Sequence, residues 1–296
     1  MSEDSNLPGL ETGYIATFGS GEPHTLFSHG FAGAIRDTRP FGTGITGTKH
    51  FLHLYGHGGR PSPGPGWDYA LIAEALAEAL TATSATQALG VSMSAGGLLR
   101  LLSDGHPVTR NLEKVALVLP ASFTGFPAEV VRSHTAYLEP LRGLVAAGDI
   151  DGITDLMLSR EPAEVTELLP ARAWTRTKAE NLVHTDMSDG LGLALEIAVD
   201  GKHLVDGNRL SDENLGGQNL SDQHLGGGVD AALERLRAFP GEVLILTHED
   251  DPAHPVFIAE EIAATVPGSR LEVLPAGSIL WRGRHEVRRI LGEFFG

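Results

Sequence analysis

The chain of 296 residues contains no cysteine, few basic side chains and no long apolar run. The absence of cysteine excludes disulfide bonds, thiolate nucleophiles and cysteine-ligated zinc. Lysine and arginine together number 22 against 38 acidic residues, giving a net charge of -16. Such an acidic surface repels phosphate backbones, so nucleic acid and anionic membranes are poor partners. No stretch approaches the ~18 uninterrupted apolar residues that a transmembrane helix requires.

Signals for targeting and for cofactors are also missing. Residues 1–5 are acidic and polar, unlike the basic and apolar start of a signal peptide, so a cytoplasmic location is expected. No His-x-x-x-His pair or carboxylate cluster has the spacing of metal ligands. The glycine-rich turns at 42–44 and 56–59 lack the third glycine of a dinucleotide fingerprint. The sequence therefore predicts no metal and no cofactor, and it leaves the oligomeric state open.

Short apolar segments that alternate with helical patterns dominate the two ends of the chain. Asp68 is suited to cap a helix that follows it, and a closing helix is expected over residues 286–295. This alternation predicts an α/β fold with a mostly parallel sheet. The expected strands are 13–18, 24–27, 51–55, 88–91, 115–119, 243–246 and 271–274.

A long stretch with a mostly helical pattern separates the fifth and sixth expected strands, 115–119 and 243–246. A doubly wound sheet does not need so long a crossover, so we expect a helical lid over residues 122–231, inserted into a core of residues 1–121 and 232–296. Within it, residues 208–227 carry a leucine at every fifth position. One coil of pentapeptide repeats cannot bury its own faces, so a flexible Gly/Asn-rich excursion is favoured, and no function is assigned to it.

The strongest local signal for chemistry is the segment 92–97, Ser-Met-Ser-Ala-Gly-Gly, between an expected strand and an expected helix. A nucleophile elbow needs small residues two positions before and two after the nucleophile, because the turn is very tight. Ser94 meets this rule with Ser92 and Gly96 as its flanks. Ser92 also meets it, with Gly90 and Ser94, but the glycine pair and the start of the helix favour Ser94 as the nucleophile.

Upstream, the expected strand 24–27 ends in Ser-His-Gly-Phe-Ala, residues 28–32. With this turn and the elbow, the chain resembles the α/β-hydrolase superfamily. The resemblance implies an α/β-hydrolase fold, a mostly parallel doubly wound sheet with an inserted helical lid. It also implies an oxyanion hole formed by the backbone N–H groups of Phe31 and Ala95. The family's orienting carboxylate would be Asp251, on the loop after strand 243–246.

The family's catalytic histidine follows the last strand, where this chain has Ser278. A second serine cannot accept the nucleophile's proton near neutral pH. Three interpretations remain: Ser278 is an introduced substitution in an ordinary hydrolase, His285 has taken over as the base, or hydrolysis has been lost. The other histidines expected near the site are assigned structural roles: His57, His248 and His254.

These features predict an enzyme that acts on a small apolar carbonyl compound, namely an ester, thioester or lactone, in a biosynthetic pathway. An apolar pocket is indicated by Phe126, Tyr137 and Trp174 in the expected lid. Without a histidine base, the retained oxyanion hole suits a non-hydrolytic catalyst such as a cyclase or isomerase. The alternative function is a catalytically inactive ligand-binding protein or receptor on the same fold.

Overall fold

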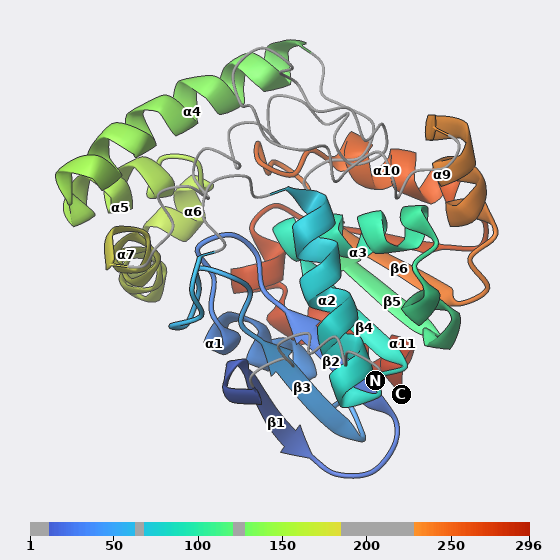
Figure 1. Ribbon diagram of the computed structural model, residues 1–296. Helices are drawn as coiled ribbons and strands as arrows, with labels where there is room; N and C mark the ends of the chain where they lie inside the picture. The colour runs from blue at the N-terminus through green and yellow to red at the C-terminus, as the bar shows by residue number, and fades with distance from the viewer. Residues whose placement is uncertain (1–11, 63–67, 121–127, 185–227) are drawn as a thin grey trace, which may run out of the picture.

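The computed structural model describes residues 12–62, 68–120, 128–184 and 228–296 (Figure 1). The described residues form one seven-stranded sheet with the order β1-β3-β2-β4-β5-β6-β7. Only β1 runs antiparallel to its neighbour, and every other pair is parallel. The predicted α/β sheet is therefore confirmed. The strands are β1 (Ile15–Gly19), β2 (His24–Ser28), β3 (Thr48–Leu52), β4 (Gln87–Val91), β5 (Lys114–Val118), β6 (Glu242–His248) and β7 (Arg270–Leu274).

Helices cover both faces of this sheet. On one face lie α2 (Tyr69–Thr83), α3 (Met93–Asp104), α9 (Gly228–Arg237) and α10 (Val256–Thr265). On the other lie α1 (Ile35–Thr38) and α11 (Arg284–Phe295). Short helical turns complete the described core: η1 (Thr12–Tyr14), η2 (Arg39–Gly42), η3 (Pro107–Asn111) and η5 (Ser278–Arg282).

The apolar run of β5 explains why this strand lies in the middle of the sheet. Side chains alternate between the two faces of a strand, and both faces of β5 are covered. Val115 and Leu117 pack with α2 and α3, whereas Ala116 and Val118 pack with α11. All four are 0% exposed. A continuous apolar sequence is therefore required here, where an alternating pattern suffices for a half-exposed strand.

Two helix assignments follow directly from local sequence. Asp68 caps α2 as predicted, since its Oδ1 accepts a hydrogen bond from the Leu71 N–H at 2.8 Å. The closing helix α11 begins at Arg284 rather than 286, and its apolar positions recur at helical spacing. Its buried side chains are Val287, Ile290, Leu291, Phe294 and Phe295.

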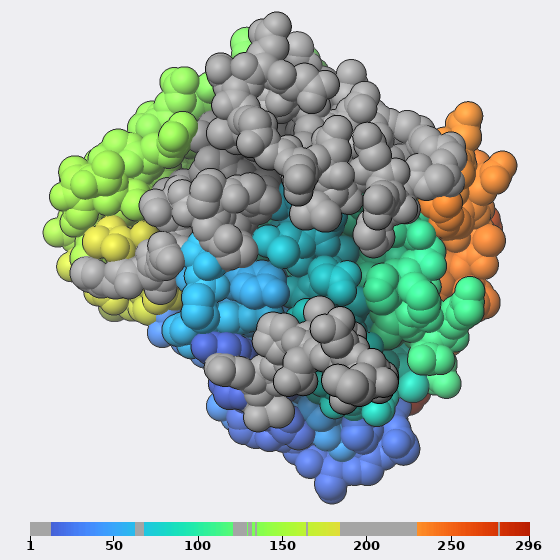
Figure 2. All heavy atoms as spheres, viewed as in Figure 1, coloured from blue at the N-terminus to red at the C-terminus, as the bar shows by residue number. Residues whose placement is uncertain are grey.

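Between β5 and β6 the described chain contains only helices. Four of these helices precede α9 in the chain: α4 (Ala128–Ala147), α5 (Ile150–Leu158), α6 (Ala163–Thr166) and α7 (Leu169–His184). They form one side of the molecule, opposite α9 in the space-filling view (Figure 2). Helices α4, α5 and α7 share a separate apolar cluster that includes Leu141, Ile153 and Leu182 and that meets the core at Ala32.

Of the two expected limits of the lid, residues 122 and 231, the structure describes only the second. Residue 122 and the stretch 208–227 lie outside the described residues. Ala231 falls inside α9, whose Ala232 and Leu236 pack with α3 in the main core. The helix leading into β6 therefore packs with the core. In the described part of the chain, no helix combines the length and the hydropathy needed to cross a membrane.

Candidate active site

The turn between β4 and α3 holds one residue in a strained conformation. Ser92 has φ 52° and ψ -109°, and it is the N-cap of α3. A side chain in this region of backbone space costs about 1–3 kcal/mol, and such strain is concentrated at functional sites. The turn directs the Ser92 hydroxyl away from the helix, into a cavity at the carboxyl ends of the parallel strands.

Gly90 makes this tight turn possible. A Cβ at Gly90 would lie 2.6 Å from the carbonyl oxygen of Ser94 and 2.7 Å from the nitrogen of Ala95. Both contacts are with backbone atoms, which cannot move aside without moving α3. The requirement for a small residue two positions before the strained serine is therefore met by glycine.

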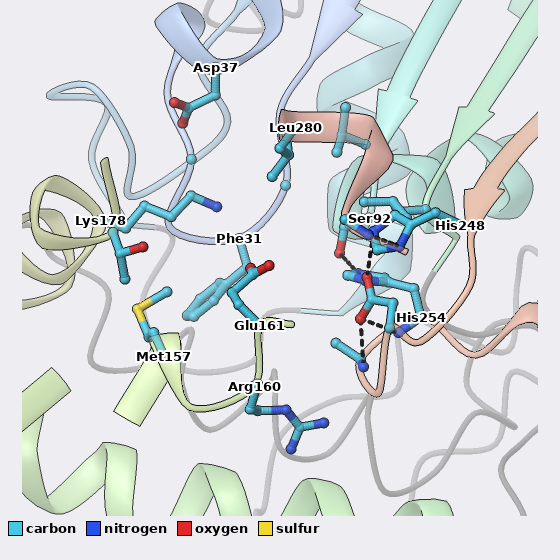
Figure 3. Close-up of a pocket in the computed structure, with 18 of the residues that line it drawn as sticks. Phe31, Asp37, Ser92, Met157, Arg160, Glu161, Lys178, His248, His254 and Leu280 are labelled. Atoms are coloured by element: carbon cyan, nitrogen blue, oxygen red, sulfur yellow. Dashed lines mark hydrogen bonds and ion pairs between the residues drawn. The ribbon is translucent and has the colours of Figure 1, made fainter. Parts of the chain in front are cut away.

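The Ser92 hydroxyl lies against a histidine and a carboxylate from the loop after β6 (Figure 3). The Nε2 of His254 is 2.9 Å from the Oγ of Ser92. On the other side of the ring, the Nδ1 of His254 is 2.7 Å from the Oδ2 of Asp251. The structure thus brings a hydroxyl, an imidazole and a carboxylate into one hydrogen-bonded chain, which is the arrangement that activates a serine nucleophile.

The surroundings of Asp251 fix the tautomer of this imidazole. Burial by itself raises the pKa of Asp251, but the charge and hydrogen bond of His254 outweigh it, with help from His248 and the Ala253 N–H. The net effect lowers the pKa of Asp251 well below its usual value. An ionised carboxylate only accepts hydrogen bonds, so the Nδ1 of His254 carries the proton. When the ring carries only this proton, its Nε2 lone pair faces the Ser92 hydroxyl.

Ser94, expected as the nucleophile, occupies a different position. It is 0% exposed, and its hydroxyl donates to the Ser28 carbonyl at 2.7 Å and accepts from the Val91 N–H at 2.8 Å. These bonds join β2 and β4 to the first turn of α3. The structure therefore brings Ser92 to the histidine and leaves Ser94 in the small position two residues later.

The loop after β2 lies beside Ser92 because it contains a glycine. A Cβ at Gly30 would be 3.1 Å from the Cβ of Ser92. The turn is closed by a hydrogen bond from the Gly33 N–H to the Gly30 carbonyl at 3.0 Å, and the Ala32 N–H donates to the Nε2 of His57 at 3.1 Å. Phe31 lies on this loop and lines the cavity.

The other expected site residues are placed as follows. Ala95 is buried in the first turn of α3 and follows Ser94, so the N–H directly after Ser92 belongs to Met93. Met93 is the first residue of α3, where backbone N–H groups have no partner within the helix. Ser278 begins η5. His285 is exposed at the start of α11 and does not line the cavity.

Two of the histidines that were given structural roles do brace the loops around the site. The Nδ1 of His57 donates to the Tyr55 carbonyl at 2.6 Å, and its Nε2 accepts from the Ala32 N–H. His248 lies on the other side of Asp251, with 3.6 Å between its Nε2 and the Oδ2 of Asp251. His254 is the exception, since it contacts Ser92 directly.

The cavity in front of Ser92 has a volume of about 230 Å³. Helices α4, α5 and α7 and the segment after α5 supply one wall, and the core loops supply the other (Figure 3). A hydrogen bond of 2.9 Å from the Trp174 Nε1 to the Oδ1 of Asp37 joins the two. The residues from the inserted helices are Tyr137, Met157, Arg160, Glu161, Trp174, Thr175 and Lys178.

Charged side chains face this cavity in addition to its apolar lining. Lys178 extends from α7 toward its centre, with its Nζ 4.1 Å from the centre of the Trp174 ring (Figure 3). Burial lowers the pKa of Lys178, an effect that the charges of Asp37 and Glu161 oppose. Burial and the charge of Asp251 raise the pKa of Glu161. Within the described residues, neither Lys178 nor Glu161 forms an ion pair, so both can meet a polar group of a bound molecule.

Among the described residues there is no group of three or more His, Asp or Glu side chains placed to hold a metal ion.

The signal for Ser92 was present in the sequence, as Gly90-x-Ser92-x-Ser94. The signal for His254 was weaker, an Asp251-x-x-His254 spacing in a loop that follows a buried strand.

The fold that carries this site is shared with proteins of known structure. No protein-family model and no curated protein matches the sequence. Solved structures do match along nearly the whole chain. A bromoperoxidase from Bacillus anthracis has a TM-score of 0.70 at 15% identity, covering 95% of this chain and 94% of that one.

Two further solved structures are similar. An esterase from Exiguobacterium antarcticum has a TM-score of 0.65 at 17% identity, covering 96% of this chain and 95% of the other. An enol-lactonase from Burkholderia xenovorans LB400 has a TM-score of 0.65 at 15% identity, covering 94% of both chains. The chain has the α/β-hydrolase fold.

Proposed function

We propose that this protein is a serine hydrolase that acts on a small ester, thioester or lactone, with Ser92 as its nucleophile in place of Ser94. The observation that carries the proposal is the chain of hydrogen bonds from Ser92 through His254 to Asp251, at 2.9 and 2.7 Å. The similar folds of an esterase and an enol-lactonase support the choice of ester chemistry. Fold alone does not determine activity, so the proposal rests on the site.

In this mechanism His254 accepts the Ser92 proton as the hydroxyl attacks the substrate carbonyl. Asp251 holds the ring in place and stabilises the imidazolium that forms. His254 then returns the proton to the leaving alcohol, thiol or ring oxygen. In the second half, His254 takes a proton from water, whose oxygen attacks the acyl carbonyl. The proton passes to the Ser92 oxygen as the acid leaves. Loss of such a base typically costs ~10⁴–10⁶ in turnover. In the proposal His254 is this base, and Ser278 needs no catalytic role.

The oxyanion of the tetrahedral intermediate would be held by the backbone N–H groups of Phe31 and Met93. Phe31 follows Gly30 on the loop beside Ser92, and Met93 directly follows the nucleophile. Each such donor typically contributes ~3 kcal/mol to the transition state. Met93 replaces Ala95 in this role because the nucleophile lies two residues earlier than expected.

The substrate we propose is small and carries a polar group besides the reacting carbonyl. The cavity of about 230 Å³ limits its size, and the inserted helices, acting as the lid, cover it on one side. Lys178 and Glu161 face this space, so a wholly apolar substrate would leave both side chains desolvated without a partner. The biosynthetic role and the cytoplasmic location expected from the sequence remain proposals.

The test compares Ser92→Ala, Ser94→Ala and His254→Ala with the unmodified chain. We expect a fluorophosphonate probe to label the unmodified chain and Ser94→Ala, and to leave Ser92→Ala unlabelled by intact-mass analysis. His254→Ala should label at least ~10³-fold more slowly, and hydrolysis of p-nitrophenyl acetate should follow the same order. Ser94→Ala is the matched control, because it removes a hydroxyl two residues away that does not line the cavity.

Two outcomes would contradict the proposal. Labelling of Ser92→Ala but not of folded Ser94→Ala would return the nucleophile to Ser94. No labelling of the unmodified chain, together with saturable binding of esters, would favour the ligand-binding alternative. Circular dichroism and the melting temperature establish that each variant is folded, since Ser94→Ala removes hydrogen bonds between β2, β4 and α3.

A further inference from the structure

A second cavity of about 230 Å³ lies next to the one in front of Ser92. The two share Asp37, Phe41, Trp174, Leu280 and Trp281 in their linings. The indole rings of Trp174 and Trp281 meet edge to face, with 5.6 Å between their centres. The second cavity is therefore bounded by the aromatic wall of the first, but neither Ser92 nor His254 lines it.

Three arginines line this second cavity. Arg284 and Arg288 are one turn apart on α11, and Arg36 lies on α1. Among the described residues, Asp37 is the one carboxylate in the lining. It meets Arg36 at 3.9 Å and also accepts hydrogen bonds from Trp174 and Ala34. The lining thus has three positive charges against one negative charge, in a chain whose net charge is -16.

The arginines on α11 differ in the carboxylate and hydrogen-bond partners of their guanidinium groups. Arg289 forms ion pairs with Glu286 and Glu293 on the same helix. Within the described residues, neither Arg284 nor Arg288 has a carboxylate partner, and Arg284 donates only to the Leu280 carbonyl at 2.6 Å. The Nε of Arg288 is buried without a hydrogen-bond partner. Guanidinium groups that outnumber the carboxylates around one cavity repel one another and favour a bound anion.

We propose that the second cavity binds a small organic anion, whose phosphate or carboxylate group lies among Arg36, Arg284 and Arg288. The apolar part of the ligand packs on Leu280 and Trp281. Arginine suits this role because its planar fork of donors matches the oxygens of both groups. The proposal does not depend on the nucleophile, since neither Ser92 nor His254 lines this cavity.

Phenyl phosphate and benzoate are the probes, because each joins an anion to one aromatic ring, and benzyl alcohol is their neutral counterpart. Binding is followed by titration calorimetry at low ionic strength, with tryptophan fluorescence as a second signal. We expect saturable binding of at least one anion and none of benzyl alcohol. Preference for phenyl phosphate would assign a phosphate ester as the ligand class, and equal or better binding of benzoate a carboxylate.

The variants locate the site. The double variant Arg284→Gln/Arg288→Gln should bind at least roughly ten-fold more weakly, because two charge-assisted contacts are lost. Arg289→Gln is the matched control on the same helix and should bind like the unmodified chain. His254→Ala should also bind unchanged, which separates this site from the cavity in front of Ser92.

The proposal is overturned if neither anion binds, or if the double variant binds both as well as the unmodified chain does. Loss of binding in His254→Ala alone would place the anion beside Ser92 instead. If the double variant does not fold, Arg36→Gln takes its place, because the Arg36 side chain is 52% exposed and contributes little to packing. The hydrolase proposal stands or falls separately, on the labelling of Ser92.

Discussion

Acidification should weaken the fold through one buried histidine that holds the loop beside Ser92. His57 is 1% exposed and neutral, with Nδ1 donating to the Tyr55 carbonyl and Nε2 accepting from the Ala32 N–H. Burial lowers the pKa of His57 to about 4, although its hydrogen bond to Tyr55 acts in the opposite direction. A second proton would break the bond from Ala32, because a protonated ring has no lone pair to accept it.

The size of the effect follows from the difference between the folded and unfolded states. In the unfolded chain His57 has its ordinary pKa of 6.5, about 2.5 units above the folded value of about 4. At 1.36 kcal/mol per unit, the difference corresponds to about 3 kcal/mol. Between pH 6.5 and pH 4 the unfolded state binds more protons, so the free energy of unfolding falls as the pH falls.

Two other buried groups, His29 and Asp251, also make the free energy of unfolding depend on pH. Burial also lowers the pKa of His29 and adds to the loss of stability in the same direction. Asp251 has a lowered pKa as well, but a carboxylate of this kind loses its stabilising contribution only below its unfolded pKa of 3.8. Its effect therefore lies below the pH window of His57.

The assay is urea unfolding at pH 7.0 and pH 4.5 for the unmodified chain and for His57→Gln, whose amide accepts a hydrogen bond but does not titrate. We expect the unmodified chain to lose about 2 kcal/mol more than the variant between these two pH values. His285→Gln is the matched control, because it makes the same change at an exposed histidine on α11. Equal pH dependence in the unmodified chain and His57→Gln would refute the reasoning.

Two further substitutions test the local structure around α2 and α3. Asp68→Ala removes the cap on Leu71 and should lower the free energy of unfolding by about 1 kcal/mol, measured by urea titration, whereas Asp68→Ser should recover most of it; an unchanged midpoint for Asp68→Ala would argue against the cap. Gly90→Ala places a Cβ 2.6 Å from the Ser94 carbonyl and should cost about 1–3 kcal/mol and abolish fluorophosphonate labelling. Wild-type labelling of Gly90→Ala would show that the turn is looser than described.

The sheet could be predicted from the sequence because its determinants are local. The apolar run of β5 and the alternation of strands with helices are visible within short windows, and so is the cap of α2 at Asp68. The antiparallel direction of β1 has no such signal, since it depends on pairing with β3, register Ile15 against Leu52. Long-range pairing of this kind is not encoded in the periodicity of either strand.

The strained turn lies at Ser92, two residues before the position that the sequence favours, and the difference has a physical cause. Two overlapping patterns of small residues, centred on Ser92 and Ser94, fit the same segment. The choice between them depends on which residue has positive φ, and that is set by where α3 begins. The glycine pair at 96–97 suggested a later start, but α3 begins at Met93, so Gly96 packs against Tyr69 inside the helix.

The contact between His254 and Ser92 could not be found from the family pattern, because it joins residues far apart in the chain. Ser92 and His254 are 162 positions apart, whereas His254 and Asp251 are three apart. The resemblance directed attention to the segment after β7, where the family carries its histidine and this chain has Ser278. The pairing of acid and base within one loop was visible only as a spacing, and many exposed loops contain such spacings.

The placement of His254 also explains what the segment after β7 can do instead. With acid and base on one loop, their mutual orientation is set by the hydrogen bonds of the Ala253 and His254 N–H groups to the Oδ1 of Asp251, at 2.8 and 3.1 Å. In the proposed mechanism η5 then has no catalytic side chain to position. Leu280 and Trp281 on η5 form the wall between the two cavities, and the arginines of α11 follow directly. Moving the base to the loop after β6 would thus free the segment after β7 to build a second binding site.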